Sequence, residues 1–254
     1  MKIVTTISQK GGVGKTTTAH ALGAGLFLLK AQRVLLVDLC GQCNLSYTMR
    51  YRQEQGGFSS LDVLTRTADA RAAIIHTDAG DLIPAAPSLV SADMLITETG
   101  KEHRLKEALQ PLKKDYDYII LDTPPALGIR TVNALTAADT VIIPTQADTY
   151  SLQGIGQLYE TIRAVKKYLN KRLQIDGILV TRYNARTIFT GDMLDLLQIT
   201  AQQLQTKVYK TRIRESVSIK EAQNRQQPIY TYNHRSNGAK DYTAFIEEFL
   251  QGMK

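Results

Sequence analysis

The sequence KGGVGKTT at residues 10–17 begins two residues after the end of a short apolar run, KIVTTI, at residues 2–7. Glycines at this place let the backbone wrap around phosphate oxygens, and the N-terminus of a following helix adds positive potential. The last residues of the stretch fit the phosphate-loop pattern G-x-x-x-x-G-K-[ST], although Gln9 occupies the first position of that pattern. We therefore predict a strand, a phosphate-binding loop and a helix in succession.

Three kinds of contact to a nucleotide are expected from this loop. Lys15 would reach the β- and γ-phosphates, and the hydroxyl of Thr16 would bind Mg²⁺. The other contacts come from the backbone of the loop, at Gly11, Gly12, Val13, Gly14 and Thr17. A glycine turn that only joins a strand to a helix is the alternative, and the spacing after a strand disfavours it.

A carboxylate ends a second apolar run, DYDYIILD, at residues 115–122. In a parallel sheet this end lies at the same edge as the phosphate loop, so Asp122 is expected to hold Mg²⁺ through water, facing Thr16. Asp122 could instead only cap the segment that follows, but its pairing with the phosphate loop favours the metal.

Short β-branched runs alternate along the chain with helical periodicity. The runs are apolar on both faces, as a parallel sheet requires: KIVTTI, RVLLVDL, YDYIILD, DTVIIPT and LQIDGILVT. Helices are expected at Lys15–Leu29, His103–Leu112, Thr131–Ala137, Leu152–Tyr168, Asp192–Gln205 and Ser236–Met253, with Ser236 as the cap of the last. This alternation predicts a doubly wound α/β fold, a mostly parallel sheet with helices on both faces. No repeat or Pro/Gly/Ser-rich linker interrupts it, so we expect a single P-loop ATPase domain at residues 1–254.

The additional lysine of the loop, Lys10, makes KGGVGKTT resemble the deviant Walker A motif of the ParA/MinD superfamily. DYDYIILDTPPALG, at residues 115–128, is similar to the Walker B region of ParA proteins. The similarity continues through NALTAADTVIIPTQADTYSLQGIGQL to a degraded C-terminal version, IRESVSIKEAQNRQQPIYTYNHRSNGAKDY. The chain is identified as a member of the short ParA class, also called Soj, which lacks an N-terminal helix-turn-helix. For Lys10 taken alone, a solvated loop lysine is the alternative.

The resemblance implies an ATP-driven switch for chromosome or plasmid partitioning. ATP and Mg²⁺ would close a homodimer face to face, with Lys10 crossing to the partner's nucleotide. The ATP-bound dimer would bind DNA non-specifically, and a ParB-like centromere-binding protein would stimulate a weak ATPase. Two alternatives with the same fold remain, a non-hydrolysing or redox-regulated nucleotide switch and a MinD-like membrane-cycling ATPase. The C-terminal KDYTAFIEEFLQGMK has adjacent glutamates and no cationic face, which disfavours membrane docking.

Both cysteines of the chain lie in VDLCGQCN, residues 37–44. The ParA family usually reads D-x-D-P-Q-G-N here. Asp38 matches the first aspartate of this pattern, which lies on the metal side of the catalytic site in the family. Cys40 stands at the position of the second aspartate, which orients the attacking water. Because a thiol is mostly neutral at pH 7 and lacks a carboxylate's second acceptor, we expect slow hydrolysis with ATP binding retained. The alternatives for Cys40 and Cys43 are inert loop filling, a reversible disulfide, or four thiolates around zinc or an iron–sulfur cluster in a dimer.

Positive charge is concentrated near the C-terminus. The net charge of the chain is +7, and residues 206–240 hold eight Lys or Arg side chains against two Glu. A solvated surface is the plain interpretation, and a face that binds phosphates is the other. Asn-Ala-Arg-Thr at residues 184–187 resembles a family segment whose arginine is implicated in DNA binding. The DNA-binding candidates are thus Arg186 first, followed by Arg212, Arg214 and Lys220.

The adenine base is expected near the carboxyl ends of the later strands, where such sheets bind ligands. Asn184 follows one of these strands and has an amide that could pair with the base edge, or it could equally form a turn. The stretch Ile213–Glu215 is the candidate for the other side of the base.

Hydropathy, the N-terminal residues and the cysteine count argue against a membrane-spanning, a secreted and a disulfide-stabilised protein. No apolar run approaches the roughly 18 residues that span a bilayer, and the N-terminus lacks the apolar segment of a signal peptide. Two cysteines in 254 residues do not make a disulfide framework. We therefore expect a cytoplasmic protein, and the resemblance to the ParA family implies that it associates with the nucleoid.

Overall fold

The computed structural model describes residues 1–52, 56–184 and 188–252, with only the backbone for 188–190. Its centre is a six-stranded sheet in the order β3-β2-β4-β1-β5-β6, in which all neighbouring strands run parallel. The strands are β1 (Lys2–Thr6), β2 (Val34–Asp38), β3 (Asp81–Ile83), β4 (Tyr118–Asp122), β5 (Thr140–Thr145) and β6 (Gln174–Val180).

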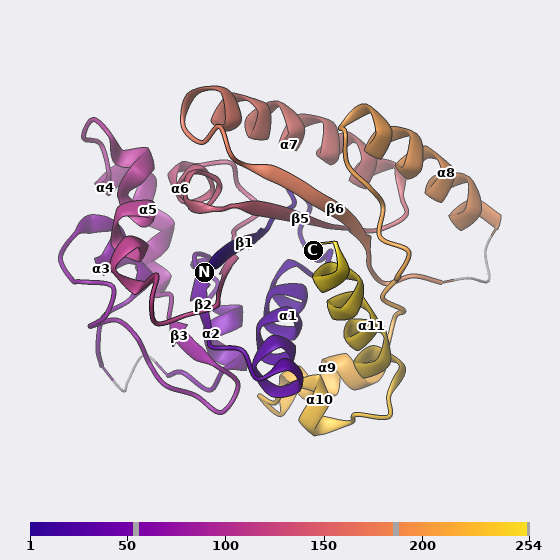
Figure 1. Cartoon of the computed structure of the whole chain (residues 1–254), viewed down its shortest axis with the longest axis horizontal. Coiled ribbons are helices and arrows are strands. Elements are labelled where there is room, and N and C mark those ends of the chain that lie inside the picture. Colours follow the sequence, from indigo (N-terminus) through magenta and orange to yellow (C-terminus); the bar gives the residue numbers. More distant parts are fainter. Residues whose placement is uncertain (53–55, 185–187, 253–254) are drawn as a thin grey trace.

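Helices cover both faces of the sheet, as Figure 1 shows. On one face lie α1 (Lys15–Lys30), α2 (Asn44–Thr48), α9 (Val217–Asn224), α10 (Ile229–Tyr232) and α11 (Asn237–Gln251). On the other lie α3 (Ser60–Thr65), α4 (Ala92–Leu95), α5 (Arg104–Leu109), α6 (Ile129–Ala137), α7 (Thr149–Tyr168) and α8 (Ile188–Gln203). Short 3₁₀ turns occupy Pro87–Ser91, Lys101–His103 and Gln110–Leu112. No helix in the described ranges has both the length and the apolar character needed to cross a membrane.

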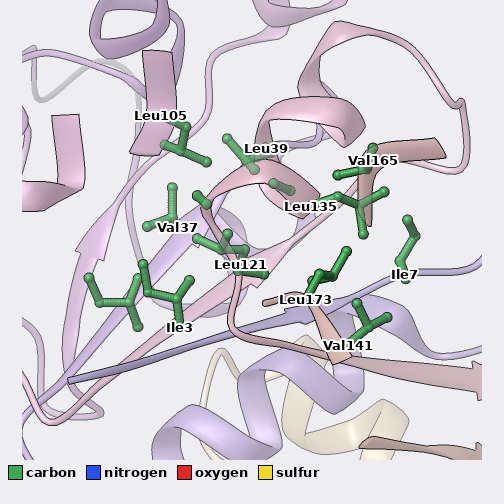
Figure 2. Packing of buried hydrophobic residues seen from close by; sticks show 14 of the residues in the cluster. Ile3, Ile7, Val37, Leu39, Leu105, Leu121, Leu135, Val141, Val165 and Leu173 are labelled. Atoms are coloured by element: carbon green, nitrogen blue, oxygen red, sulfur yellow. The ribbon is translucent and has the colours of Figure 1, made fainter. Parts of the chain in front are cut away.

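Each strand supplies two hydrophobic cores because consecutive side chains point to opposite faces of the sheet. In β1, Ile3 belongs to the core under α5 to α8, whereas its neighbour Val4 belongs to the core under α1 and α11. Figure 2 shows the first core, where Val37, Leu121 and Val141 from three strands meet helical side chains. Burial of each large apolar side chain is worth about 1.5–3 kcal/mol. This two-sided burial explains the continuous apolar runs of the sequence.

The predicted doubly wound α/β architecture is confirmed, and all five predicted strands form. The strand that sequence reasoning missed is β3, which has only three residues at the sheet edge and pairs with β2 alone. A run this short carries no measurable periodicity. The predicted cap of the last helix is also confirmed, because Oγ of Ser236 accepts a hydrogen bond of 3.2 Å from the N–H of Ala239.

The last helix, α11, packs closely on α1, the helix that follows the phosphate loop. A Cβ atom built on Gly25 of α1 would lie 2.3 Å from Cδ1 of Ile246 on α11. Glycine therefore permits the close approach of the two helices at this point. Phe245 and Phe249 of α11 fill the core beneath, and this packing fixes the position of α1 relative to the sheet.

A buried histidine of α1 predicts how stability depends on pH. His20 is 7% exposed, and its Nε2 has no partner among the described residues. Burial lowers the pKa of His20 from 6.5 to about 4. Between these values the unfolded chain binds a proton that the folded chain excludes, so stability falls as the pH drops from 6.5 to 4. We expect His20 to account for a loss of about 3 kcal/mol over this range.

The measurement is urea unfolding of the wild type and of His20→Leu at several pH values from 4 to 7. The variant removes this titration and keeps the carboxylates, so the difference between the two curves isolates the histidine. The stability of the wild type should fall relative to His20→Leu as the pH is lowered. Parallel curves would contradict the buried neutral state of His20.

Candidate nucleotide site

The predicted site residues meet at the carboxyl edge of the sheet because three adjacent parallel strands end there. The phosphate loop follows β1, Asp38 ends β2 and Asp122 ends β4. Asp38 and Asp122 are direct neighbours in the register of these strands, and Thr6 of β1 pairs with Asp122 on the other side. The sheet thus brings together residues that lie more than a hundred positions apart in the chain.

The phosphate loop has the backbone conformation that its glycines allow. Gly12 and Gly14 have φ angles of 75° and 86°, in the left-handed region that favours glycine. Gly14 caps α1, and its carbonyl accepts a hydrogen bond of 2.8 Å from the N–H of Thr18. The other N–H groups at the start of α1 remain available to bind an anion. The predicted phosphate contacts therefore lie on one continuous loop and helix start.

Lys15 lies folded against this loop. Its ammonium group donates a hydrogen bond of 2.9 Å to the carbonyl of Lys10, and its side chain is largely buried. Burial lowers the pKa of Lys15, and the nearby charges of Asp122 and Cys40 oppose this shift. A lysine that is held in the loop and partly desolvated is well placed to bind a phosphate.

The arrangement of Thr16 and Asp122 fits a magnesium ion. Oγ1 of Thr16 donates a hydrogen bond of 2.7 Å to Oδ2 of Asp122, and Oδ1 of Asp122 has no partner among the described residues. Burial, with the neighbouring charge of Asp38, raises the pKa of Asp122 to about 8. A buried carboxylate oxygen without a partner is costly, and a cation or its bound water would satisfy it.

No group of three or more His, Cys, Asp or Glu side chains in the described part of the chain is arranged to hold a metal ion. This agrees with magnesium, which keeps several waters and needs one or two carboxylates plus phosphate oxygens. It gives no support to a zinc or iron–sulfur site within one copy of the chain. Cys40 and Cys43 are both free thiols.

The carboxylate of Asp38 accepts hydrogen bonds from the loop that carries the cysteines and from the helix that follows it. Its Oδ1 accepts a hydrogen bond of 3.0 Å from the N–H of Cys40. Its Oδ2 accepts two bonds from Ser46, 2.9 Å from the N–H and 2.7 Å from the hydroxyl. Burial raises the pKa of Asp38, and these bonds oppose the shift. The predicted catalytic and metal-side role of Asp38 stays a prediction, and the visible role is to fix the position of Cys40.

A cavity of about 520 Å³ lies between the phosphate loop and this cysteine loop. Its walls are formed by Gly11, Gly12, Gly14, Lys15, Thr16, Thr17, Cys40, Gln42, Asn44, Tyr47, Thr48, Thr123, Pro125, Gln223 and Asn224. Cys40 faces the cavity, and burial raises the pKa of its thiol, so the group is neutral at pH 7. Cys43 instead precedes α2 and lies outside this lining. Of the two cysteines, Cys40 is the one placed to contact a bound ligand.

A smaller cavity of about 180 Å³ adjoins the first and shares Gly12, Gly14, Thr17 and Gln223 with it. The predicted stretch Ile213–Glu215 lines it, which suits a base bound beside the phosphates. Asn184, the predicted adenine contact, is exposed and lines neither cavity.

Sequence reasoning missed Gln223 of α9, which reaches the phosphate loop from the C-terminal part of the chain. Its Nε2 donates a hydrogen bond of 2.8 Å to Oγ1 of Thr17. No local pattern marks this residue, because the contact depends on how α9 packs beside α1.

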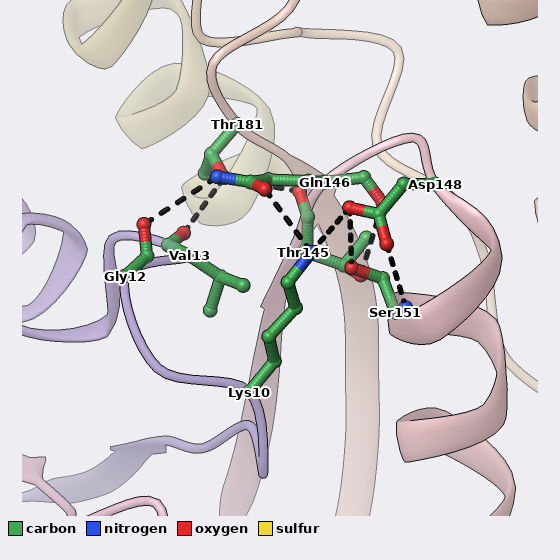
Figure 3. Close-up of polar contacts among 8 residues, drawn as sticks. All are labelled: Lys10, Gly12, Val13, Thr145, Gln146, Asp148, Ser151 and Thr181. Carbon is green, nitrogen blue, oxygen red and sulfur yellow. Dashed lines mark hydrogen bonds and ion pairs between the residues drawn. The ribbon is translucent and has the colours of Figure 1, made fainter.

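Lys10 is bound to another part of its own chain. Figure 3 shows its ammonium group between Gln146 and Asp148, at 3.3 Å from Oε1 of Gln146 and 2.5 Å from Oδ2 of Asp148. Asp148 also caps α7 by accepting a hydrogen bond from the N–H of Ser151. Lys10 does not line the cavity beside Lys15. The loop lysine is thus held by an ion pair at the start of α7, away from its own phosphate site.

The predicted DNA-binding residues occupy different surroundings. Arg186 lies outside the described residues. Arg212 stacks on the ring of Tyr183 at 4.9 Å and donates a hydrogen bond to its hydroxyl. Arg214 forms an ion pair with Asp241 at 2.6 Å, and Lys220 lies 3.5 Å from Glu215. Arg214 and Lys220 therefore each have a carboxylate beside them within the chain, and DNA binding by these residues stays a prediction.

The sequence of this chain is similar to that of several known proteins. A family described as an AAA domain matches residues 1–175. The sporulation initiation inhibitor protein Soj of Bacillus subtilis is 41% identical over 97% of this chain and 97% of its own length. The chromosome partitioning protein ParA of Myxococcus xanthus is 35% identical over 98% of this chain and 88% of its own.

A solved structure agrees with the fold. The cobyrinic acid a,c-diamide synthase of Mycobacterium smegmatis, solved with an ATP analogue and magnesium, is 34% identical and superposes with a TM-score of 0.86. The match covers 100% of this chain and 96% of that one.

Proposed function

The chain belongs to the ParA/Soj family of P-loop ATPases, and we propose that it is an ATP-dependent dimer switch for chromosome or plasmid partitioning. The observation that carries the proposal is the pair of lysines in one phosphate loop. Lys15 lies over the loop, and Lys10 is held outside the site of its own chain. A lysine kept away from its own nucleotide is free to serve the nucleotide of a second copy.

ATP and Mg²⁺ are the proposed ligands. Thr16 and Asp122 would hold the ion, and Lys15 and the loop backbone would hold the phosphates. Magnesium supplies positive charge between the β- and γ-phosphates when bound. In the proposed dimer, Lys10 exchanges the carboxylate of Asp148 for a phosphate of the partner's nucleotide. The exchange keeps the lysine paired in both states, so its energetic cost is small.

DNA is the proposed partner of the ATP-bound dimer, through Arg186, Arg212, Arg214 and Lys220, and a ParB-like centromere-binding protein is the proposed activator. Arg212 has its guanidinium partly engaged with Tyr183, and Arg214 would have to share Asp241 with a phosphate. Contacts of this kind depend on the negative charge of the DNA phosphates and do not distinguish base sequences. We propose a cytoplasmic location on the nucleoid for the same reason.

Two other functions fit the fold less well. The solved synthase is named for a different reaction, the synthesis of cobyrinic acid a,c-diamide. Its sequence identity to this chain is 34%, whereas that of Soj is 41%. A membrane-cycling ATPase needs a basic amphipathic helix. Phe245, Ile246 and Phe249 of α11 are instead buried against the sheet, so this helix has no free apolar face for a membrane.

The test is binding to two unrelated DNA duplexes with ATP and Mg²⁺, with ADP and Mg²⁺, and with no nucleotide. We expect binding with ATP only, equal for both sequences, together with a doubling of mass in light scattering. The logarithm of the affinity should fall linearly with the logarithm of salt concentration, with a slope of about −0.9 for each phosphate contacted. Lys10→Ala should lose the dimer and the DNA binding together. Equal DNA binding with ADP, or dimers that persist in Lys10→Ala, would contradict the proposal.

A further inference from the structure

Five cations gather where α7 ends and the chain turns toward β6. The stretch of residues 161–175 contains five Lys or Arg side chains and no Asp or Glu, which gives it a charge of +5. No other stretch of fifteen residues in the chain carries as much net positive charge. All five of these residues are exposed. We call them the α7 basic surface: Arg163, Lys166, Lys167, Lys171 and Arg172.

Most of this charge is left unbalanced within the chain. Arg163 forms an ion pair of 3.2 Å with Glu160, which lies one turn earlier on α7. The side chains of the other four cations form no ion pair or hydrogen bond within the described ranges. Asp176, the next acid along the chain, lies 3.7 Å from Lys207. The α7 basic surface is thus short of negative charge in the free protein.

Helix electrostatics explains only part of this arrangement. The C-terminus of a helix carries partial negative charge, which favours the cations Lys166 and Lys167 in the last turn of α7. Lys171 and Arg172 follow the end of the helix, beyond the turn in which this effect is felt. Arg163 and Lys167 are four positions apart on α7, a spacing at which like charges repel each other. Stability of the free protein therefore gives no reason for all five cations.

A polar hollow of about 300 Å³ opens beside these cations, between α7, the start of β6 and the end of α8. Its lining includes two cations and two amide side chains: Arg163, Lys166, Gln174 and Gln205. No Asp or Glu is among the described residues that line it. Guanidinium, ammonium and amide groups donate hydrogen bonds to phosphate oxygens. The hollow is therefore suited to receive a phosphate group at the margin of the α7 basic surface.

The α7 basic surface lies far from the nucleotide site. α7 begins after Asp148, the residue that holds Lys10, and its 20 residues span about 30 Å. Its C-terminal end lies at the amino edge of the sheet, where the chain enters β6 (Figure 1). The phosphate loop, Asp38 and Asp122 lie at the carboxyl edge. A second copy that closes over the nucleotide edge would therefore leave this surface uncovered.

We propose that the α7 basic surface binds the phosphates of double-stranded DNA. The inference rests on the proposed function as a DNA-binding switch, and it adds a contact surface at the edge of the sheet opposite the nucleotide. Unpaired surface cations release the counterions of DNA phosphates on binding, without regard to base sequence. The C-terminal candidates differ, because Arg214 pairs with Asp241 and Lys220 lies beside Glu215. An ATP-bound dimer presents two α7 basic surfaces, so a duplex long enough to reach both is bound more tightly than by one copy.

An anionic membrane is the other common partner of a basic surface, and the apolar side chains disfavour it. Membrane-bound segments combine cations with several exposed apolar side chains that enter the bilayer. Within residues 161–175 the one exposed large apolar side chain is Tyr168, and the ammonium group of Lys167 lies 4.9 Å from its ring. The surface therefore offers charge and hydrogen-bond donors, which suit the phosphates of DNA.

The test compares two double variants that have the same net charge. Lys166→Gln/Lys171→Gln removes two unpaired cations of the α7 basic surface. The matched control, Lys106→Gln/Lys113→Gln, removes two exposed lysines from a part of the chain where acids are interspersed. Each variant loses two charges from +7 and has a net charge of +5. Affinity for a long labelled duplex is measured with ATP and Mg²⁺ at several salt concentrations, and thermal melting checks that both variants fold.

We expect Lys166→Gln/Lys171→Gln to lose at least about tenfold in DNA affinity at low salt. Its slope of log affinity against log salt should become shallower by about 2, since each lost phosphate contact contributes about 0.9. The control should keep the slope of the wild type and an affinity within about twofold of it. Equal losses in the two variants would overturn the proposal, because only the total charge would then matter.

Unchanged DNA binding by Lys166→Gln/Lys171→Gln would also overturn the proposal. So would a loss confined to binding of vesicles of phosphatidylserine and phosphatidylcholine, which would assign the surface to a membrane. Equal DNA binding by the wild type with ATP and with ADP would contradict the proposed switch alone. In that case the comparison of the two variants would still decide whether the α7 basic surface contacts DNA.

Discussion

Lys15→Ala should lose ATP binding, with an affinity at least about a hundredfold lower and turnover below detection. Among the described residues, Lys15 supplies the one side-chain cation that lines the nucleotide cavity, and burial has already removed much of its water. Its bonds to phosphate oxygens are charge-assisted, and each such bond is worth about 1.5–3 kcal/mol. A loss of two of them accounts for a factor of about a hundred or more.

The free protein should tolerate this change. Within the described part of the chain, the side chain of Lys15 makes a single hydrogen bond, to the carbonyl of Lys10, and its loss costs about 1 kcal/mol. Isothermal titration with ATP and Mg²⁺ measures the affinity, and thermal melting without nucleotide checks the fold. Lys30→Ala is the matched control, since Lys30 ends the same helix and its ion pair with Glu247 is loose at 3.6 Å. Retained ATP affinity in a folded Lys15→Ala protein would remove the phosphate-loop assignment.

Sequence reasoning succeeds for the fold where a pattern is local. The apolar runs predict strands because both faces of the sheet are covered, and glycines beside a lysine and a threonine predict the phosphate loop. The neighbouring positions of Asp38 and Asp122 follow from the same reasoning, because parallel strands end at one edge. Confirmed here are the strands, the fold class and the meeting of Thr16 with Asp122.

Sequence reasoning fails where a property depends on how distant segments pack together. The hydrogen bond from Gln223 to Thr17 joins residues two hundred positions apart, and no periodicity reports it. The ion pair of Lys10 with Asp148 also joins residues far apart in the sequence. A count of charges also could not show that Arg214 and Lys220 have carboxylates beside them. The burial of Arg130 on α6 is likewise decided by packing, since a charged residue in a helix is ordinarily expected at the surface.

Cys40 stands where the resemblance to the ParA family implies a second aspartate in the loop. A neutral thiol faces the cavity, and Asp38 fixes its backbone. The balance of charge is therefore shifted toward positive compared with an aspartate at position 40. Such a site would hold the ATP state firmly and orient the attacking water poorly, so the switch would stay closed for longer.

Cys40→Asp should hydrolyse ATP at least about tenfold faster than the wild type in the presence of DNA, a difference of about 1.4 kcal/mol in the barrier. The new carboxylate would accept a hydrogen bond from the attacking water. Cys40→Ser is the matched control, because a hydroxyl has a similar size without the carboxylate. Turnover is measured under reducing conditions as phosphate release at saturating ATP. Acceleration in the aspartate variant alone would show that Cys40 holds the switch in a slow ATP state. Equal rates in all three proteins would mean that another group positions the water, and the slow hydrolysis expected from Cys40 would be wrong.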